Sequence, residues 1–477
     1  MNGIQNQEPN PIADAIKQIT DHYLREASDP ENQPICKVAD TETASILTEK
    51  YALPDDTPHE IEDVLKEAIE VNDYRIRNGH PRFFGFIPSP ILPVAWLGDV
   101  VSSVFNVHAG SRMQSSGASA IEKSLIHWMA TAAGLPAETA GGISVSGGSM
   151  ANLTAMILAR DNKLPLDKMQ VGVAYVSDQT HSSVAKGLRV LGFRADQVRK
   201  VPSNDKFQLD IQALEDAIKT DRDSGLYPFM IIATSGTTNT GAIDPIDAIT
   251  EIARREDLWV HVDGAYGASA ILSKTRRKLF NGLGKVDSIS WDAHKWLFQT
   301  YTCSFVLVRD KSLLSKSFHT SAEYVQDATD MDYIPNYWNF GIELTRPARA
   351  TKFWFTLRVL GLDKISSMLD HGIDLAEYAE QQVRKLPQWQ ITSPASLAIV
   401  TFRHVPEGKT DAQLDELNTK ISQQLLAENV AGALTTRVHG RVVLRMCSIH
   451  PELSRDSMKD IVARMHDIGQ ELASCMP

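Results

Sequence analysis

The sequence predicts an α/β fold built on a mostly parallel sheet, with a helical arm before it and a smaller α+β region after it. Short β-branched or apolar runs alternate with turns and helix-compatible segments from about residue 120 to 310. Repetition of strand, turn and helix is typical of a parallel sheet. Near both ends of the chain, apolar residues also recur at helical spacing. We therefore expect its 477 residues to form three parts, residues 1–78, 79–355 and 356–477.

The first part is predicted to be a helical arm. Between Ile12 and Ala27, the apolar residues of one face recur at helical spacing, namely Ile12, Ile16, Ile19 and Tyr23. The capping-box pattern Thr57–Glu60, with a proline at the first helical position, announces a second helix. An amphipathic arm without enough residues for its own core must dock on a larger surface, in its own chain or in a partner subunit.

The second part carries the predicted sheet. Its expected strands are Val171–Ser177, Val198–Val201, Phe229–Thr234, Trp259–Val262, Ser288–Ser290 and Ser304–Val308. Segments such as Asp244–Arg255 have helical character and lie between them. In such sheets, ligands collect beyond the carboxyl ends of the strands. The residues that follow each strand are therefore the first candidates for a functional site.

The third part is predicted to be strand-rich and then helical. One final amphipathic helix is indicated by apolar residues at alternating spacings of three and four, namely Met458, Ile461, Met465, Ile468 and Leu472.

Composition narrows the function. Lys and Arg number 48 against 59 Asp and Glu, a net charge of −11, which disfavours nucleic acid and anionic lipid as partners. Four scattered cysteines without a C-x-x-C pair indicate reduced thiols and no zinc site. The polar start lacks the pattern of a signal peptide, and prolines interrupt the longest apolar stretch, Phe83–Val107. We expect a cytoplasmic protein that acts on a small molecule and needs no metal.

Two of the segments that follow strands suit a ligand. Ser146–Ser149 is a glycine-rich turn that opens a helix, where backbone N–H groups and the helix dipole favour a phosphate. The alternative is a tight turn that needs glycine for its conformation. Asp178–Ser183 contains His181, which can stack on a flat ligand or carry a proton, or else cap the next helix.

Two further segments add hydroxyl and charged groups. Thr234–Thr238 offers small hydroxyl residues, which suit either a ligand or a polar turn. Asp263 ends one buried strand, and Lys295 follows another 32 residues later. Buried charges are costly unless they are paired or functional. A salt bridge between neighbouring strands explains these two charges but leaves the phosphate turn and His181 unexplained.

Together these groups are what pyridoxal 5′-phosphate (PLP) requires. A lysine amine forms a Schiff base with its aldehyde, once burial or a nearby charge lowers the pKa of that amine. A carboxylate against the pyridine nitrogen keeps the ring protonated, so that it accepts electrons from a breaking bond. Lys295 suits the first role and Asp263 the second.

The motifs also resemble a known family. Ser146–Asn152, Asp178–Lys186, Thr234–Asp244, His261–Gly267 and Ser290–Leu297 together are similar to fold-type I, group II PLP-dependent decarboxylases, the family of aromatic L-amino-acid decarboxylase. The resemblance runs from about His80 through the carboxyl-terminal part. Segments such as Phe84–Pro88, Val107–Gly110 and Glu343–Arg349 are most similar to bacterial tryptophan decarboxylases.

The resemblance implies roles for individual residues. Lys295 matches the Schiff-base lysine, His181 the imidazole that stacks on the ring, and Asp263 the partner of the pyridine nitrogen. The other implied cofactor contacts are Gly148, Ser149, Thr238, Ala265, Asp292 and His294. Asp292 stands where many animal and plant relatives carry asparagine.

A loop tyrosine that protonates the carbanion is also implied. A gapless match back from Lys352 puts Tyr337 at this position, within the stretch Thr320–Phe340. Tyr333 lies one helical turn away, and Tyr324 begins the loop. Tyrosine there is associated with amine formation, and phenylalanine with oxidative aldehyde formation. The alternative for Tyr337 is a packing aromatic.

The implied reaction is decarboxylation of an aromatic L-amino acid to its amine, with tryptophan first and phenylalanine or tyrosine next. Glutamate or diaminobutyrate would need a charged pocket. The candidates for the side-chain pocket are Phe84, Phe86, His108, Trp338 and Leu344. Transamination, aldehyde synthesis and an inactive scaffold are the competing readings. The family also implies a homodimer with active sites at the subunit interface.

Overall fold

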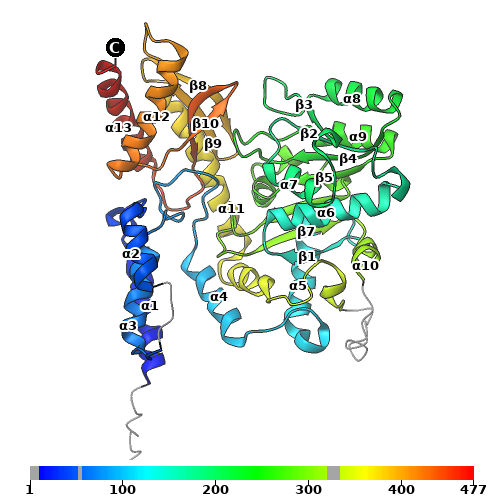
Figure 1. Cartoon of the computed structure of the whole chain (residues 1–477), viewed down its shortest axis with the longest axis horizontal. Coiled ribbons are helices and arrows are strands. Elements are labelled where there is room, and N and C mark those ends of the chain that lie inside the picture. Colours follow the sequence, from blue (N-terminus) through cyan, green and yellow to red (C-terminus); the bar gives the residue numbers. More distant parts are fainter. Residues whose placement is uncertain (1–9, 52–55, 320–333, 477) are drawn as a thin grey trace, which may run out of the picture.

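The computed structural model describes residues 10–51, 56–319 and 334–476, and a seven-stranded sheet lies at its centre (Figure 1). The strands are β1 (Gly141–Val145), β2 (Gly172–Ser177), β3 (Val198–Val201), β4 (Tyr227–Thr234), β5 (Trp259–Asp263), β6 (Ser288–Asp292) and β7 (Ser304–Val308). They lie in the order β1-β7-β6-β5-β4-β2-β3. The strands from β3 to β6 in that order are parallel, whereas β7 runs antiparallel to β6 and β1. The predicted α/β fold with a mostly parallel sheet is confirmed.

The central strands are buried along almost their whole length. Because both faces are covered, these strands read as apolar runs without alternation, which made them visible in the sequence. β1 was not among the predicted strands, since it begins with two glycines. Gly142 has a structural reason, because a Cβ atom there would collide with the carbonyl of Val306 on β7.

Helices cover both faces of this sheet (Figure 1). The helices of this part are α4 (Pro93–Phe105), α5 (Arg112–Ala132), α6 (Gly148–Lys163), α7 (Ser182–Val190), α8 (Ile211–Asp223), α9 (Ile246–Glu256) and α10 (Ser312–Phe318), of which α5, α6, α8 and α9 pack on the sheet. α6 packs against the middle of the sheet, on β4 to β7. Its first turn lies at the carboxyl ends of β5 and β6, since a Cβ atom at Gly148 would lie within 3.1 Å of Asp292 and Ala265.

A second, antiparallel sheet forms the carboxyl-terminal part, in the order β10-β11-β9-β8. Its strands are β8 (Trp389–Ser396), β9 (Ile399–His404), β10 (Thr435–Val438) and β11 (Arg441–Cys447), packed by α11 (Arg349–Val383), α12 (Asp411–Ala427) and α13 (Arg455–Ser474). The predicted final helix is α13, and its apolar stripe enters a second hydrophobic core. The proposed boundary at residue 355 lies inside α11, which is kinked at Gly361.

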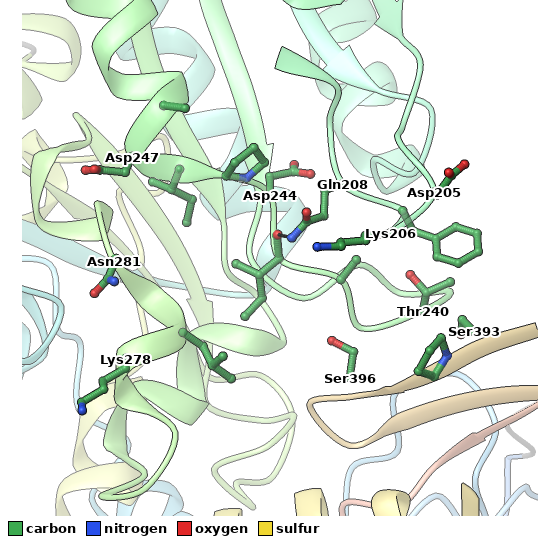
Figure 2. Close-up of a pocket in the computed structure, with 18 of the residues that line it drawn as sticks. Asp205, Lys206, Gln208, Thr240, Asp244, Asp247, Lys278, Asn281, Ser393 and Ser396 are labelled. Carbon is green, nitrogen blue, oxygen red and sulfur yellow. Dashed lines mark hydrogen bonds between the residues drawn. The ribbon is translucent and has the colours of Figure 1, made fainter. Parts of the chain in front are cut away.

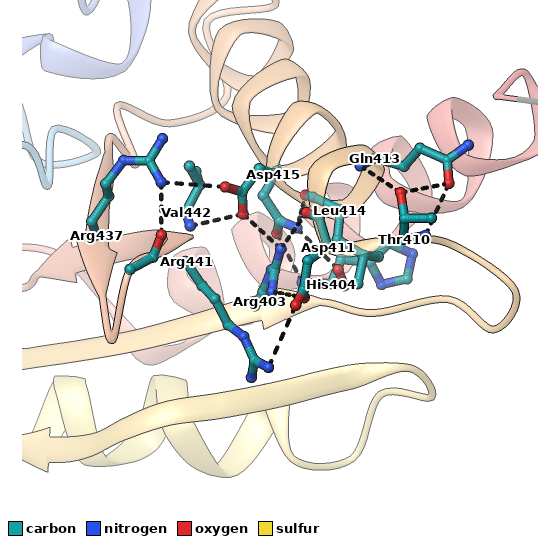
Figure 3. A network of polar contacts seen from close by, with 12 residues as sticks. Arg403, His404, Thr410, Asp411, Gln413, Leu414, Asp415, Arg437, Arg441 and Val442 are labelled. Carbon is teal, nitrogen blue, oxygen red and sulfur yellow. Dashed lines mark hydrogen bonds and ion pairs between the residues drawn. The ribbon is translucent and has the colours of Figure 1, made fainter.

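A buried arginine ties α12 to this small sheet (Figure 3). Arg403 of β9 is 2% exposed and donates to Asp411 Oδ1 at 3.1 Å and to Asp415 Oδ1 at 2.6 Å. The same Asp415 oxygen accepts from the Val442 amide of β11 at 2.9 Å. A buried guanidinium is tolerated when its charge is paired in this way. The network therefore connects α12 with two neighbouring strands.

The arm consists of α1 (Pro11–Ser28), α2 (Thr41–Tyr51) and α3 (Ile61–Asp73), and no residue of these described helices is buried. Ile12 and Ile16 remain 60% and 59% exposed, so part of the apolar face of α1 is uncovered in the single chain. α3 begins after Glu60, so the predicted start at the capping box Thr57–Glu60 is wrong by about one turn. α2 was not predicted, because its apolar residues form no clear stripe.

Candidate active site

The carboxyl ends of β5 and β6 bring the predicted acid and lysine together. These strands are parallel neighbours, with Asp263 opposite Ser290, and Lys295 follows β6 by one turn. Lys295 Nζ lies 2.9 Å from Asp292 Oδ2. The salt bridge of Lys295 is therefore made with Asp292, and not with Asp263 as the structural alternative supposed.

Charge around Lys295 favours its protonated form. Burial lowers the pKa of its amine, but the carboxylates of Asp292 and Asp263 outweigh burial and raise it above the usual value. Burial raises the pKa of Asp292, but Lys295 and His294 outweigh it, and this pKa lies below its usual range. In the protein alone, the two nearby carboxylates therefore raise the pKa of Lys295, whereas burial by itself would lower it.

Asp263 is held by three donors. Its Oδ1 accepts from the Ala265 amide at 3.1 Å and from Ser290 Oγ at 3.2 Å, and its Oδ2 accepts from Asn152 Nδ2 at 2.9 Å. The residue is 6% exposed. A buried carboxylate held on both oxygens presents a fixed negative charge to any cationic group placed before it.

The predicted phosphate turn opens α6 beside these strand ends. Gly147 caps the helix in an extended conformation and offers no side-chain acceptor to the first turn. A Cβ atom at Gly148 would lie 2.8 Å from Asp292 Oδ2 and 3.1 Å from the Cβ of Ala265. Glycine at this position therefore allows close approach of the turn to β5 and β6. Ser149 is exposed, and it adds a hydroxyl at the uncapped helix N-terminus.

His181 precedes α7 and caps it. Its Nδ1 accepts from the Ser183 amide at 3.2 Å and lies 2.9 Å from Ser183 Oγ. Nδ1 therefore caps α7, as the alternative interpretation of His181 proposed. The side chain is nevertheless exposed, so the same imidazole remains accessible to a ligand.

The segment that follows β4 holds hydroxyls without a protein partner. Thr234 Oγ1 and Ser235 Oγ are buried and have no hydrogen-bond partner among the described residues. Unpaired buried hydroxyls are uncommon. With the carboxylate of Asp263, the amine of Lys295 and the uncapped turn of α6, they form a set of polar groups that fits PLP.

Three further residues were not singled out from the sequence. Ser89 Oγ is buried and donates to the carbonyl of His294. Asn152 contacts Asp263 from the buried face of α6. Arg445 is 5% exposed, donates to the carbonyls of Thr238 and Phe86, and leaves Nη2 unpaired within the described parts of the chain. Asn152 lies inside a motif that was recognised, whereas Arg445 is distant in sequence from every other site residue.

Tyr337, to which the resemblance assigns the role of loop proton donor, is buried. It begins the short 3-10 helix η8 (Tyr337–Asn339) and is 2% exposed. Its ring contacts Phe340, and the guanidinium of Arg346 lies 5.1 Å from the ring centroid. Burial raises the pKa of Tyr337, and the Glu122 carboxylate adds to this shift. The packing alternative describes this environment. Tyr324 and Tyr333 lie outside the described residues.

The residues predicted for the side-chain pocket do not all lie together in the structure. His108, Trp338 and Leu344 adjoin Gly110: its amide donates to His108 Nδ1, its carbonyl accepts from the Trp338 amide, and a Cβ there would lie 2.8 Å from the Leu344 carbonyl. Phe84 is 1% exposed inside the second core, so its proposed place in a substrate pocket is wrong within one chain. Phe86 is 61% exposed.

A cavity adjoins the segment that follows β4. It measures about 690 Å³ and is lined by the β3–α8 and β4–α9 connections and by the end of β8 (Figure 2). Its lining includes Thr240, Asp244 and Ser396, and none of the predicted cofactor contacts. Asp244 accepts from the Thr234 amide at 2.7 Å, and burial raises the pKa of this carboxyl to about 6. The cavity and the candidate site therefore share one connecting segment as a wall.

Two absences are also recorded for the described part of the chain. No helix there is both apolar and long enough to cross a membrane. In the same ranges, no group of three or more His, Cys, Asp or Glu side chains is arranged to hold a metal ion.

Comparison with known proteins agrees with this chemistry. Residues 47–405 match the pyridoxal-dependent decarboxylase conserved domain. An aromatic-L-amino-acid decarboxylase of Bacillus atrophaeus is 37% identical over 97% of this chain and 95% of its own. An L-2,4-diaminobutyrate decarboxylase of Acinetobacter baumannii is 30% identical over 85% and 82%. The structure of Oryza sativa TDC with PLP and tryptamine superposes with a TM-score of 0.91 and 26% identity, covering 98% of this chain and 99% of that one.

Proposed function

Since the chain belongs to the pyridoxal-dependent decarboxylases, and within them to the aromatic amino acid decarboxylase family, we propose that it converts L-tryptophan to tryptamine and CO2. It is a PLP-dependent carboxy-lyase, and phenylalanine and tyrosine are the next substrates that we propose. One observation carries the assignment: Lys295 follows β6 with its amine 2.9 Å from Asp292, and the nearby charge of Asp263 also raises the pKa of that amine.

Each residue then has one task. When bound, PLP supplies the electron sink for the bond to the departing carboxylate. Lys295 offers its amine to the aldehyde, and Asp263 holds a negative charge against the ring nitrogen. The first turn of α6, with Gly148 and Ser149, receives the phosphate. His181 covers the ring, and the remaining proposed contacts are Thr238, Ala265, Asp292 and His294.

Arg445 is assigned to an anionic group of the bound substrate. Burial lowers the pKa of its guanidinium, and two backbone carbonyls, those of Thr238 and Phe86, accept from it. The unpaired Nη2 at this junction is a donor that no other described residue uses. A buried guanidinium gains most from a charged acceptor.

The side-chain pocket favours an aromatic substrate over diaminobutyrate. A buried side-chain ammonium is best stabilised by a carboxylate that is not already paired. Beside Leu344, the carboxylate of Glu343 is held by both terminal nitrogens of Arg349, at 2.7 and 2.9 Å. His108 and Trp338 supply an imidazole and an indole instead. We therefore rank a flat aromatic ring above a charged chain.

Incubation with a mixture of the twenty amino acids tests the proposal. Mass analysis is expected to show tryptamine as the main amine, with one CO2 released for each amine and no consumption of oxygen. Phenethylamine or tyramine as the main product would move the preference to phenylalanine or tyrosine. A keto acid, or an aldehyde formed with hydrogen peroxide, would contradict decarboxylation to the amine. Enzyme that carries Lys295→Ala serves as the blank.

Tyr337→Phe is expected to keep the amine as product and to retain kcat within about threefold, because its ring is buried against Phe340 and Arg346. Product analysis with a peroxide assay makes the measurement. If the variant formed aldehyde and hydrogen peroxide, Tyr337 would be the proton donor that the sequence comparison implied. A loss of thermal stability with unchanged product ratio would support the packing role.

We also propose a homodimer. Besides Ile12 and Ile16 on α1, α4 leaves Val104 and Phe105 exposed by 73% and 72%. Apolar residues grouped on a helix end are typical of a surface that another chain covers.

A further inference from the structure

A chain of buried polar side chains lies behind Asp263. It runs from β5 and β6 to α6, and each link measures 2.9 Å: Trp259 Nε1 to Ser288 Oγ, Ser288 Oγ to His261 Nδ1, His261 Nε2 to Asn152 Oδ1, and Asn152 Nδ2 to Asp263 Oδ2. His261 and Ser288 are 0% exposed, and Asn152 is 1% exposed. The sequence showed only the end of this chain, at Asp263.

The carboxylate fixes the orientation of every member. A carboxylate only accepts, so the amide nitrogen of Asn152 must face Asp263, and its oxygen must face His261. His261 therefore donates from Nε2. Burial lowers the pKa of His261 to about 4, so its ring is neutral and Nδ1 accepts from the Ser288 hydroxyl. The indole N–H of Trp259 donates to the same Ser288 oxygen.

All these hydrogen bonds consequently point the same way, toward Asp263. Aligned hydrogen bonds polarise one another in a low-dielectric interior. The result is a stronger and better oriented donor at the Asp263 carboxylate than an isolated amide would provide.

Asn152 has a second branch. Its Nδ2 also lies 3.2 Å from Ser183 Oγ, which in turn lies 2.9 Å from His181 Nδ1. One amide group therefore contacts Asp263 directly and reaches His181 through a single hydroxyl. These are the two residues assigned to the ring nitrogen and to the ring face of PLP.

We propose that Asn152, held in place by His261, is a positioning residue that orients Asp263 and His181 together around the cofactor ring. This inference rests on the proposed role of Asp263 at the ring nitrogen. Packing alone does not require such a chain, because apolar side chains of similar volume fill a core without the desolvation penalty of polar groups.

The test measures the pH at which the ring nitrogen of PLP loses its proton. Enzyme loaded with PLP that carries 15N in the pyridine ring is titrated with pH and followed by NMR, alongside kcat and thermal unfolding. His261→Met removes the donor to Asn152 with little change in volume. In this variant, the ring nitrogen is expected to lose its proton at a lower pH than in wild type, and kcat is expected to fall roughly 10–100-fold.

Two variants separate positioning from stability. His261→Gln keeps an N–H donor toward Asn152 and is expected to restore kcat to within about threefold of wild type. His404→Met is the matched control, since His404 is equally buried and its pKa is also lowered to about 4, but it belongs to the small sheet. It is expected to lose thermal stability with an unchanged 15N titration.

The outcomes are distinct. An unchanged 15N titration and kcat in His261→Met, with only a lower unfolding temperature, would overturn the inference. Should His261→Met fail to fold, Ser288→Ala removes only the hydroxyl that donates to His261, and the same titration decides. Asp263→Ala identifies failure of the proposed function: if it too leaves the titration unchanged, the carboxylate does not face the ring nitrogen. If the 15N titration shifts in Asp263→Ala but not in His261→Met, Asp263 faces the ring nitrogen but the chain of hydrogen bonds behind it does not orient it.

Discussion

Lys295→Ala is expected to lower kcat at least about 10³-fold, because it removes the amine that holds the cofactor aldehyde. The same change leaves Asp292 buried at 1% exposure without the ammonium that lies 2.9 Å from it. The variant is therefore also expected to bind a proton at Asp292 more readily. The measurements are kcat for amine formation and the mass of the protein after reduction with borohydride, which traps the bond between PLP and a lysine.

Lys352→Met is the matched control for this experiment. Lys352 is another buried lysine, and its Nζ lies 3.1 Å from Asp99 Oδ1 and 2.9 Å from Thr300 Oγ1. Its loss is expected to lower stability and to leave the borohydride-trapped adduct in place. Retention of the adduct, or of more than a tenth of kcat, in Lys295→Ala would assign the chemistry to a different amine.

The sequence predicted best what the ends of parallel strands determine. Asp263 and Lys295 are 32 residues apart, but both follow buried apolar runs, and parallel neighbours end at the same edge of a sheet. The glycine turn before α6 reaches the same edge by a different route, because it follows β1, which was not predicted and pairs antiparallel with β7. Local pattern plus one topological rule was therefore enough to place the acid and the lysine in one site.

Periodicity does not reveal which core a side chain enters. Phe84 lies in an aromatic segment with Phe86, yet one is buried in the second core and the other is exposed. Tyr337 lies next to Trp338 in the sequence, and nothing in that segment indicates that the buried Arg346 packs against the Tyr337 ring. Such contacts join residues whose meeting depends on how α11 and the small sheet pack, which no local pattern records.

The sequence also did not reveal the role of polar residues inside helices. Asn152 lies on the buried face of α6, where a helical pattern would place an apolar residue. The departure from that pattern was visible in the sequence, but its partners His261 and Asp263 come from β5. Only the register of the strands shows that their side chains reach the same amide.

Asp263→Asn is expected to lower kcat about 10³-fold and to weaken retention of PLP, although the side chain keeps its shape. A negative charge beside the ring nitrogen favours its protonated form, so its removal lowers the pH at which that nitrogen loses its proton. The new amide also meets donors on both sides, since Asn152 Nδ2 contacts Oδ2 while the Ala265 amide and Ser290 Oγ contact Oδ1. One of these hydrogen bonds must break, which leaves a buried donor unpaired.

Asp287→Asn separates the loss of charge at the ring from a general effect of removing a carboxylate from the sheet. Asp287 lies just before β6, at its other end, and accepts from the Val260 amide of β5 at 2.7 Å. Burial raises the pKa of Asp287, so the neutral amide relieves a desolvation penalty there. Steady-state kinetics and equilibrium dialysis of PLP are expected to show wild-type values in Asp287→Asn. A kcat within threefold of wild type in Asp263→Asn would mean that the ring functions without this carboxylate, because the change removes its charge while preserving its volume.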